Sequence, residues 1–161
     1  MPGMQPVNET DIEWDDYEGV EGEFKQKQLG GTAGSEQLGC SLYELPAGCQ
    51  PWSYHYHAAN EEALYVLSGT GTLRLGSETY ELQEGDYVPC PTDESGAHCV
   101  VNDSDSTLRY LAVSTMREPD VTVHPDIGKV GVYVGAPPGS DDDRAISEFY
   151  DHASGAESEE P

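Results

Sequence analysis

The stretch HYHAANEE, residues 55–62, carries two histidines two positions apart, followed by a pair of glutamates. An apolar run over residues 63–67 comes next and ends at Ser68-Gly69. Side chains alternate between two faces along a strand, so His55 and His57 lie on one face if this stretch is extended. Two imidazoles on one face, with a carboxylate brought back by a short turn, can bind a divalent metal ion. The rest of the chain is expected to enclose this site.

The chain around this stretch has the pattern of an all-β domain. Short apolar or alternating segments recur about every ten residues between Gly-, Pro- and Asp-rich turns, which is typical of a sandwich or barrel. No stretch of this central region has a long helical period, and a chain of 161 residues is expected to form one domain. The expected strands cover residues 38–45, 52–57, 63–67, 72–75, 79–82, 87–91, 98–102, 108–114, 121–123 and 129–134.

Four consecutive parts of the chain are expected. They are an N-terminal arm with an edge strand (1–37), a barrel core (38–115), strands that pack on the barrel (116–135) and an acidic tail (136–161). The edge strand over residues 24–29 contains two lysines, which suit an exposed edge. In the tail, Asp143 is expected to cap a short helix with Ile146, Phe149 and Tyr150 on one stripe.

The charge of the chain is extreme. Lys and Arg total 7 and Asp and Glu total 31, so the formal net charge is −24 at pH 7. Such a chain is expected to repel nucleic acids and anionic membranes, because both are bound through basic contacts. In molar salt the Debye length is about 3 Å, so this self-repulsion becomes tolerable. A halophilic protein with an acidic solvated surface is therefore expected.

The sequence also predicts a location and a redox state. No N-terminal segment resembles a signal peptide and no run approaches the roughly 20 apolar residues of a membrane span, so a cytoplasmic protein is expected. Cys40, Cys49, Cys90 and Cys99 contain no CxxC pair, and they are expected to be reduced, buried thiols. A disulfide between Cys90 and Cys99 stays open as an alternative.

Two sequence motifs resemble those of the cupin family. The first family motif is Gly, five residues, His-x-His, three or four residues, Glu, six residues, Gly. In this chain six residues separate Gly48 from His55, four separate His57 from Glu62, and six separate Glu62 from Gly69. This spacing selects Glu62 over Glu61 as the metal-facing carboxylate, and strand parity agrees, because Glu62 shares a face with Leu64 and Val66.

The second family motif is Gly, five residues, Pro-x-Gly, two residues, His, three residues, Asn. Here five residues separate Gly85 from Pro91, and three residues separate His98 from Asn102. The loop over residues 92–97 is two residues longer than the family pattern. Because this loop is expected at the mouth of the site, it is where an unusual substrate would be recognised.

The resemblance covers roughly residues 38–115 and implies a cupin double-stranded β-helix, an antiparallel β-barrel of jelly-roll type. It also implies four metal ligands: His55, His57, Glu62 and His98. Three imidazoles and one carboxylate suit one divalent transition metal, either Fe, Mn, Ni, Cu or Zn. Four protein ligands leave two positions of an octahedral ion for water, dioxygen or substrate. Open edges of such barrels tend to pair across subunits, so a homodimer is expected.

Two classes of function follow from the resemblance. The first is a metal-dependent enzyme acting on a small oxygenated molecule, either a dioxygenase or a sugar or sugar-phosphate isomerase. The segment over residues 110–130 is similar to that of small cupins that have been likened to sugar-phosphate isomerases. The second is a non-catalytic binding or sensor module for a sugar-like ligand, with a structural metal. No catalytic residue is assigned, and few cations are present to hold a phosphate-rich substrate.

Other polar residues have expected supporting roles. Gln50, Tyr65 and Asn102 are candidates for fixing the histidine tautomers. Arg74 and Arg109 are expected to form ion pairs, and His124 and His152 lie outside the motifs and are not expected to bind the metal. Trp52, Tyr54 and Tyr56 are expected on the face turned away from the barrel interior, where they pack or contact a partner.

Overall fold

The computed structural model describes residues 4–140 and 142–152. The strands are β1 (Asp15–Glu18), β2 (Glu23–Gln28), β3 (Leu38–Leu45), β4 (Tyr56–His57), β5 (Glu62–Ser68), β6 (Gly71–Leu75), β7 (Glu78–Leu82), β8 (Tyr87–Cys90), β9 (His98–Val101), β10 (Leu108–Thr115), β11 (Asp120–His124), β12 (Lys129–Val134) and β13 (Ile146–Asp151). The helical segments are short: α1 (Leu29–Ala33), η1 (Glu9–Asp11), η2 (Glu94–Gly96) and η3 (Pro125–Ile127).

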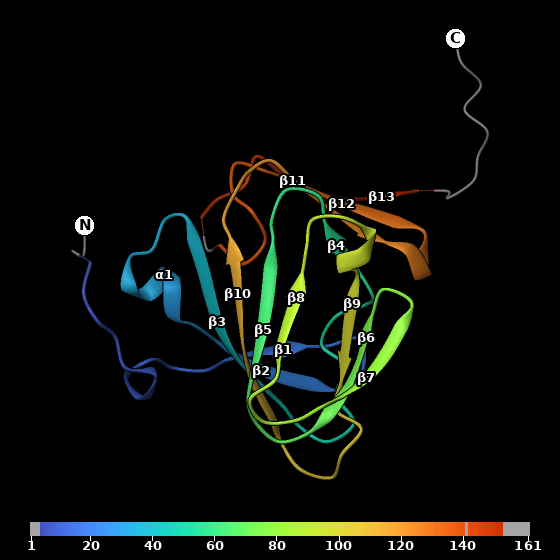
Figure 1. Ribbon diagram of the computed structural model, residues 1–161. Coiled ribbons are helices and arrows are strands. Elements are labelled where there is room, and N and C mark those ends of the chain that lie inside the picture. The colour runs from blue at the N-terminus through green and yellow to red at the C-terminus, as the bar shows by residue number, and fades with distance from the viewer. Residues whose placement is uncertain (1–3, 141, 153–161) are drawn as a thin grey trace.

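The strands form three antiparallel sheets that close around one interior (Figure 1). The largest sheet has the order β1-β2-β3-β10-β5-β8, and it faces a sheet of order β13-β12-β11-β4 and another of order β7-β6-β9. A bridge between His55 and His98 connects the two smaller sheets. The predicted all-β fold, an antiparallel barrel of jelly-roll type, is confirmed.

The core lies between the large sheet and the two smaller ones. Alternate residues of the central strands point inward, so Leu64 and Val66 of β5 are 4% and 1% exposed while Tyr65 between them is 44% exposed. On β3 and β10, the rings of Tyr43 and Tyr110 stack with centroids 5.1 Å apart. Leu64, Tyr43 and Tyr110 also line the cavity described below, so the apolar core continues directly into the polar site.

The predicted edge strand at residues 24–29 is wrong in its position. β2 lies between β1 and β3, and Lys27 is only 5% exposed. The N-terminal segment covers this lysine, because the Lys27 Nζ lies 4.3 Å from the centre of the Trp14 ring and donates to the carboxylate of Glu9 at 3.1 Å. The sequence pattern could not show this cover, which comes from residues far away along the chain.

The predicted helix after Asp143 is also wrong. Residues 146–151 form β13, which pairs with β12 from Lys129↔Asp151 to Val134↔Ile146. The helical stripe of Ile146, Phe149 and Tyr150 is equally a set of β-branched and aromatic residues with high strand propensity. Pairing with the otherwise open edge of β12 decides between the two. The remainder of the predicted acidic tail, residues 153–161, lies outside the described residues.

Several smaller predictions can be compared with the structure. All four cysteines are free thiols, Cys49 and Cys90 buried and Cys40 and Cys99 half-buried. The predicted ion pairs are confirmed: Arg74 binds Asp126 at 2.6 Å, and Arg109 binds Glu9 at 2.7 Å and Glu44 at 3.1 Å. In residues 4–140 and 142–152, none of the helices has the length and apolar composition needed to cross a bilayer.

Replacing Glu9 by glutamine is expected to destabilise the fold near neutral pH. Hydrogen bonds from Arg109 and Lys27 lower the pKa of Glu9 below its ordinary value. A carboxylate with a lowered folded-state pKa stabilises the fold above its unfolded pKa, and this contribution is lost as the pH falls through the folded pKa. Because Glu9 is partly exposed, the expected loss is about 1 kcal/mol, or about 2–4 °C in the unfolding midpoint.

The measurement is thermal unfolding followed by circular dichroism from pH 7 to pH 3. Glu23→Gln, at an exposed position of β2, is the matched control. The difference between wild type and Glu9→Gln should shrink at the acid end. Equal midpoints for Glu9→Gln and Glu23→Gln at pH 7 would show that the Glu9 contacts contribute nothing.

Candidate metal centre

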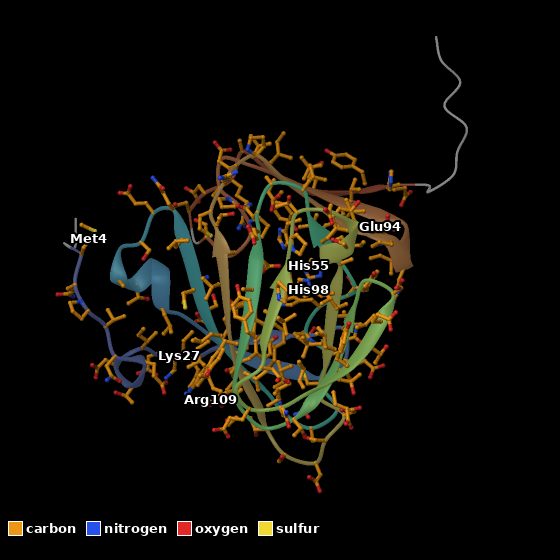
Figure 2. All side chains as sticks on the ribbon, in the orientation of Figure 1. Met4, Lys27, His55, Glu94, His98 and Arg109 are labelled. Carbon is orange, nitrogen blue, oxygen red and sulfur yellow. The ribbon has the colours of Figure 1, made fainter. Side chains whose placement is uncertain are left out.

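The four predicted ligand residues converge on one end of the barrel from three different strands. His57 ends β4, His98 begins β9 and Glu62 begins β5. His55 precedes β4 and is held beside His98 by two backbone hydrogen bonds, of 3.2 and 2.9 Å. Figure 2 shows His55 and His98 close together in the interior, and their ring centroids are 4.9 Å apart. The regular strand predicted over residues 52–57 is therefore mostly an irregular segment that only joins β4 at its end.

Each of the three histidines has its Nδ1 held by a hydrogen-bond acceptor. Nδ1 of His55 donates to the carbonyl of Ser53 at 2.7 Å, and Nδ1 of His98 donates to the carbonyl of Gly96 at 3.0 Å. Nδ1 of His57 donates to Oδ2 of Asp120 at 2.7 Å. A carbonyl or carboxylate oxygen only accepts, so in the neutral rings the proton lies on Nδ1 and Nε2 presents a lone pair. This is the tautomer that a metal ligand requires.

Glu62 supplies the negative charge of the centre. Its Oε2 lies 3.3 Å from Nε2 of His57 and 3.6 Å from Nε2 of His98. His55, Glu62 and His98 each offer a ligand atom within 4.8 Å of the others. Within the described part of the chain, the buried Oε2 has no hydrogen-bond partner. An unpartnered buried carboxylate oxygen is costly, and a divalent cation would satisfy it, so these residues fit a transition metal.

The turn between His57 and Glu62 is held by the segment that leads into β11. Oδ1 of Asp120 accepts the backbone N–H of Ala59 at 3.0 Å. Asn60 is 3% exposed; its amide nitrogen donates to the carbonyl of Arg117 at 2.9 Å, and its Oδ1 accepts the N–H of Arg117 at 2.6 Å. These contacts explain why the carboxylate predicted from spacing reaches the histidines, because they fix the length and direction of the turn.

Buried charge gives the histidines opposite electrostatic surroundings. Burial, together with the neighbouring His98 and His57, lowers the pKa of His55 well below its ordinary value. Burial also acts to lower the pKa of His57, but the hydrogen bond that His57 donates to Asp120 and the charge of Glu62 outweigh it and raise the pKa. His55 is therefore neutral at pH 7, and Asp120 supports positive charge at His57.

Sequence reasoning missed Asp120 and chose the wrong supporting residues. Gln50 donates to the carbonyl of Trp52 and to the thiol of Cys99. Tyr65 is 44% exposed. Asn102 donates to the carbonyls of Leu45 and Ser106. None of these groups contacts a ligand histidine. Asp120 lies 63 residues after His57, and only the pairing of β11 with β4 brings them together. No local signal in the sequence predicts that pairing.

The long loop over residues 92–97 has a different role from the predicted one. It contains η2, whose Asp93 caps the turn by accepting the N–H of Ser95 at 2.9 Å. A Cβ on Gly96 would lie 2.0 Å from the carbonyl oxygen of Pro91, so only glycine allows this close approach. The loop thereby places the Gly96 carbonyl that orients His98, whereas no residue of 92–97 lines the cavity described below.

A cavity of about 590 Å³ opens at the ligand residues. Its walls are mostly apolar and include several aromatic rings, among them Tyr43 and Tyr110 from the large sheet and Tyr133 and Phe149 from β12 and β13. Trp52 also lines it, 43% exposed and with its ring edge-on to Phe24 at 5.3 Å, so the prediction that it faces away is wrong. Tyr54 does pack away from the cavity: it is 7% exposed and its hydroxyl donates to the carbonyl of Gly76 at 2.9 Å.

His124 lines the cavity but is not placed as a ligand. Its ring stacks on His55 with centroids 5.3 Å apart, while Nδ1 contacts the hydroxyl of Ser53 at 2.8 Å and Nε2 that of Thr122 at 2.9 Å. Both ring nitrogens are thus engaged by hydroxyl groups that also line the cavity. Burial, followed by the effect of His57, lowers the pKa of His124. This residue is a polar group beside the centre that the motifs did not predict.

Comparison with solved structures supports the architecture over nearly the whole chain. A candidate sugar phosphate isomerase from Acidithiobacillus ferrooxidans is 27% identical, with a TM-score of 0.75 over 88% of this chain and 86% of that one. A sugar phosphate isomerase from a cupin superfamily, from Silicibacter pomeroyi, is 22% identical, with a TM-score of 0.75 over 90% and 91%. The polyketide cyclase RemF from Streptomyces resistomycificus is 24% identical, with a TM-score of 0.60 over 70% and 79%.

The sequence itself matches one family description. Residues 41–114, which contain all four predicted ligands, match the cupin domain family Cupin_2. No curated protein matches the chain significantly. The family match covers the two histidine motifs, and the structural neighbours extend the likeness to the strands on both sides. The two histidine motifs thus lie in a segment that matches a cupin domain, and the structure has the cupin fold.

Proposed function

We propose that this chain is a metal-dependent enzyme that isomerises a small oxygenated molecule. The observation that carries the proposal is the convergence of three Nε2 lone pairs and the unpartnered Oε2 of Glu62 at one end of an open cavity of about 590 Å³. A purely structural metal site is closed by its protein ligands, whereas this one faces a space large enough for a substrate.

The four side chains with free lone pairs define which metal ions would bind and in what geometry they would be held. His55, His57, Glu62 and His98 would hold one divalent transition metal, which when bound supplies Lewis-acid polarisation of substrate oxygens. The protein supplies the orientation, because Ser53, Asp120 and Gly96 each hold a histidine in one tautomer. The aromatic rings in the wall offer flat apolar surfaces against which the body of a substrate can pack.

Isomerisation requires a group that takes a proton from one carbon and returns it to the next. His124 lies in the cavity wall, outside the ligand set, with the hydroxyls of Ser53 and Thr122 on its two ring nitrogens. We assign this proton transfer to His124, with the two hydroxyls as relays. Two solved structures that bear the isomerase name match this chain at TM-scores of 0.75, which supports the choice of reaction class.

Dioxygenation is the second candidate. It is favoured by the aromatic lining of Tyr43, Tyr110, Tyr133 and Phe149, which suits an aromatic or planar substrate more than a sugar. In that reaction dioxygen is consumed and both of its atoms enter the product, so oxygen uptake separates it from isomerisation. The non-catalytic binding module, the homodimer, the cytoplasmic location and the halophilic origin stay predictions.

Removal of a ligand should abolish metal binding. The chelator-treated wild type is expected to bind about one equivalent of Zn²⁺ or Ni²⁺, and His57→Ala and Glu62→Gln are expected to lose most of this binding. Isothermal titration calorimetry and elemental analysis are the measurements, with circular dichroism to confirm folding. His152→Ala, at an exposed position, is the control. Equal metal content in wild type and in both ligand variants would contradict the proposal that these residues bind a metal ion.

Asp120→Asn should weaken metal binding without removing a ligand. The carboxylate of Asp120 accepts hydrogen bonds from His57 Nδ1 and from the N–H of Ala59, and an asparagine has only one acceptor oxygen and no negative charge. The expected loss in metal affinity is therefore about 10–100-fold. Nitrogen-15 NMR of wild type should show the Nδ1-protonated tautomer at His55, His57 and His98, and the variant should change it at His57 alone. An unchanged affinity together with an unchanged His57 tautomer would assign Asp120 a folding role only.

His124→Gln should separate chemistry from metal binding. With the metal-loaded enzyme and a panel of small hydroxy-carbonyl compounds and keto acids in D₂O, NMR should detect exchange of a C–H proton beside the carbonyl without oxygen uptake. The variant is expected to lower kcat by about 100-fold or more, while its metal affinity stays at the wild-type value. Oxygen uptake with catechols or diketones would instead favour the dioxygenase, and full activity of His124→Gln would exclude this residue.

A further inference from the structure

Arg144 lies in the wall of the cavity, between the β12 and β13 strands in the chain. Its Nε donates to the carbonyl of Ala136 at 3.0 Å, and its Nη2 donates to the carbonyls of Pro137 at 2.8 Å and Ser140 at 3.2 Å. These contacts fix the half-buried guanidinium in place and use three of its five N–H groups. The two N–H groups of Nη1 have no protein acceptor among the described residues, so they are available to a ligand.

The charge of Arg144 is compensated differently from that of most other cations. Lys27, Arg74, Arg109 and Lys129 each pair with a carboxylate within 4.0 Å. In the described ranges, Arg144 has neutral carbonyl partners only. Lys25 and Arg117 also have no carboxylate within that distance among these residues, but both are exposed and neither lines the cavity. Arg144 is thus the single Lys or Arg among the described residues that line the cavity.

A continuous row of rings connects Arg144 to the metal centre. The guanidinium lies 5.5 Å from the centre of the Tyr133 ring, Tyr133 meets Phe149 edge-on at 6.4 Å, and Phe149 contacts His124 at 5.4 Å. His124 in turn stacks on His55 at 5.3 Å. The row is built by β11, β12 and β13, which lie side by side in one sheet (Figure 1). One wall of the cavity therefore runs from a cation at one end to the ligand residues at the other.

We propose that Arg144 is the anion subsite of this cavity and that the substrate is a small carboxylate with a planar, unsaturated or aromatic body. Its oxygen-bearing end lies at the four ligand residues, its flat face on the row of rings, and its carboxylate on Nη1 of Arg144. A guanidinium matches the planar carboxylate and strengthens each hydrogen bond by its charge. This inference rests on the proposed function, because it assigns the substrate class of the same site.

The same observations disfavour a phosphate ester. A phosphate dianion in a chain of net charge −24 needs several cations or a helix N-terminus to hold it. In residues 4–140 and 142–152, the cavity lining offers one guanidinium, and α1, the one α-helix, spans only Leu29–Ala33. The substrate class therefore differs from the one named for the two isomerase-like neighbours.

The test compares two ligands that differ only in the charged group. 3,4-Dihydroxybenzoate and 3,4-dihydroxybenzamide present the same two oxygens to a Ni²⁺-loaded site, and their affinities are measured by calorimetry for wild type, Arg144→Gln and Arg117→Gln. Wild type is expected to prefer the benzoate by about tenfold or more. Arg144→Gln should lose this preference and keep its affinity for the benzamide, whereas the exposed control Arg117→Gln should behave as wild type.

Three outcomes would overturn the inference. Equal losses for both ligands in Arg144→Gln would mean that Arg144 only holds the loop of residues 136–140. If the wild type binds the benzoate and the benzamide equally well, the subsite does not distinguish a charged ligand from a neutral one. Tighter binding of ribose 5-phosphate than of the benzoate would show that the subsite prefers a phosphate to a carboxylate. Failure of the proposed function is separate, since it appears as absent metal binding or as absent C–H exchange with the metal-loaded protein. The benzoate–benzamide comparison can also be made on metal-free protein.

Discussion

The hydrogen bond between the carboxylate of Asp120 and Nδ1 of His57 is the contact on which the site depends. Asp120 is fully buried, and the same carboxylate accepts the N–H of Ala59 in the turn that returns the chain to Glu62. One side chain therefore sets a histidine tautomer and the position of the Glu62 carboxylate. A buried carboxylate without such partners would cost several kcal/mol, so this end of the barrel is stable only when β11 lies beside β4.

Polar burial at this end is balanced by apolar packing elsewhere in the barrel. The inward residues of β3, β5 and β10 belong to the core, and among them Leu64, Tyr43 and Tyr110 also line the cavity, where the two tyrosine rings are stacked. The barrel thus passes from a packed core to an open, ring-lined space within the same strands. The β12–β13 hairpin, which follows the segment that matches a cupin domain, completes that space with Tyr133, Phe149 and Arg144.

Much of the fold and the ligand set was predictable because it is encoded locally. Strand parity and turn spacing placed Glu62 with Leu64 and Val66 on the inner face, and the structure shows all three there. The wrong predictions share a different origin. Lys27 was expected at an exposed edge, but Trp14 and Glu9 cover it. Ile146, Phe149 and Tyr150 were expected on a helix, but they lie in a strand that pairs with the open edge of β12. Both depend on contacts between segments distant in sequence.

By itself, the sequence determined the all-β class, the two histidine motifs and the choice of Glu62 over Glu61, because these follow from periods and spacings along a few strands. Only the tertiary structure decided what orients the histidines and what lines the cavity. Asp120, His124, Phe149 and Arg144 reach the site through the pairing of β4, β11, β12 and β13. The register of that pairing is a long-range property of the folded chain, so no local pattern reveals which side chains it brings to the candidate metal centre.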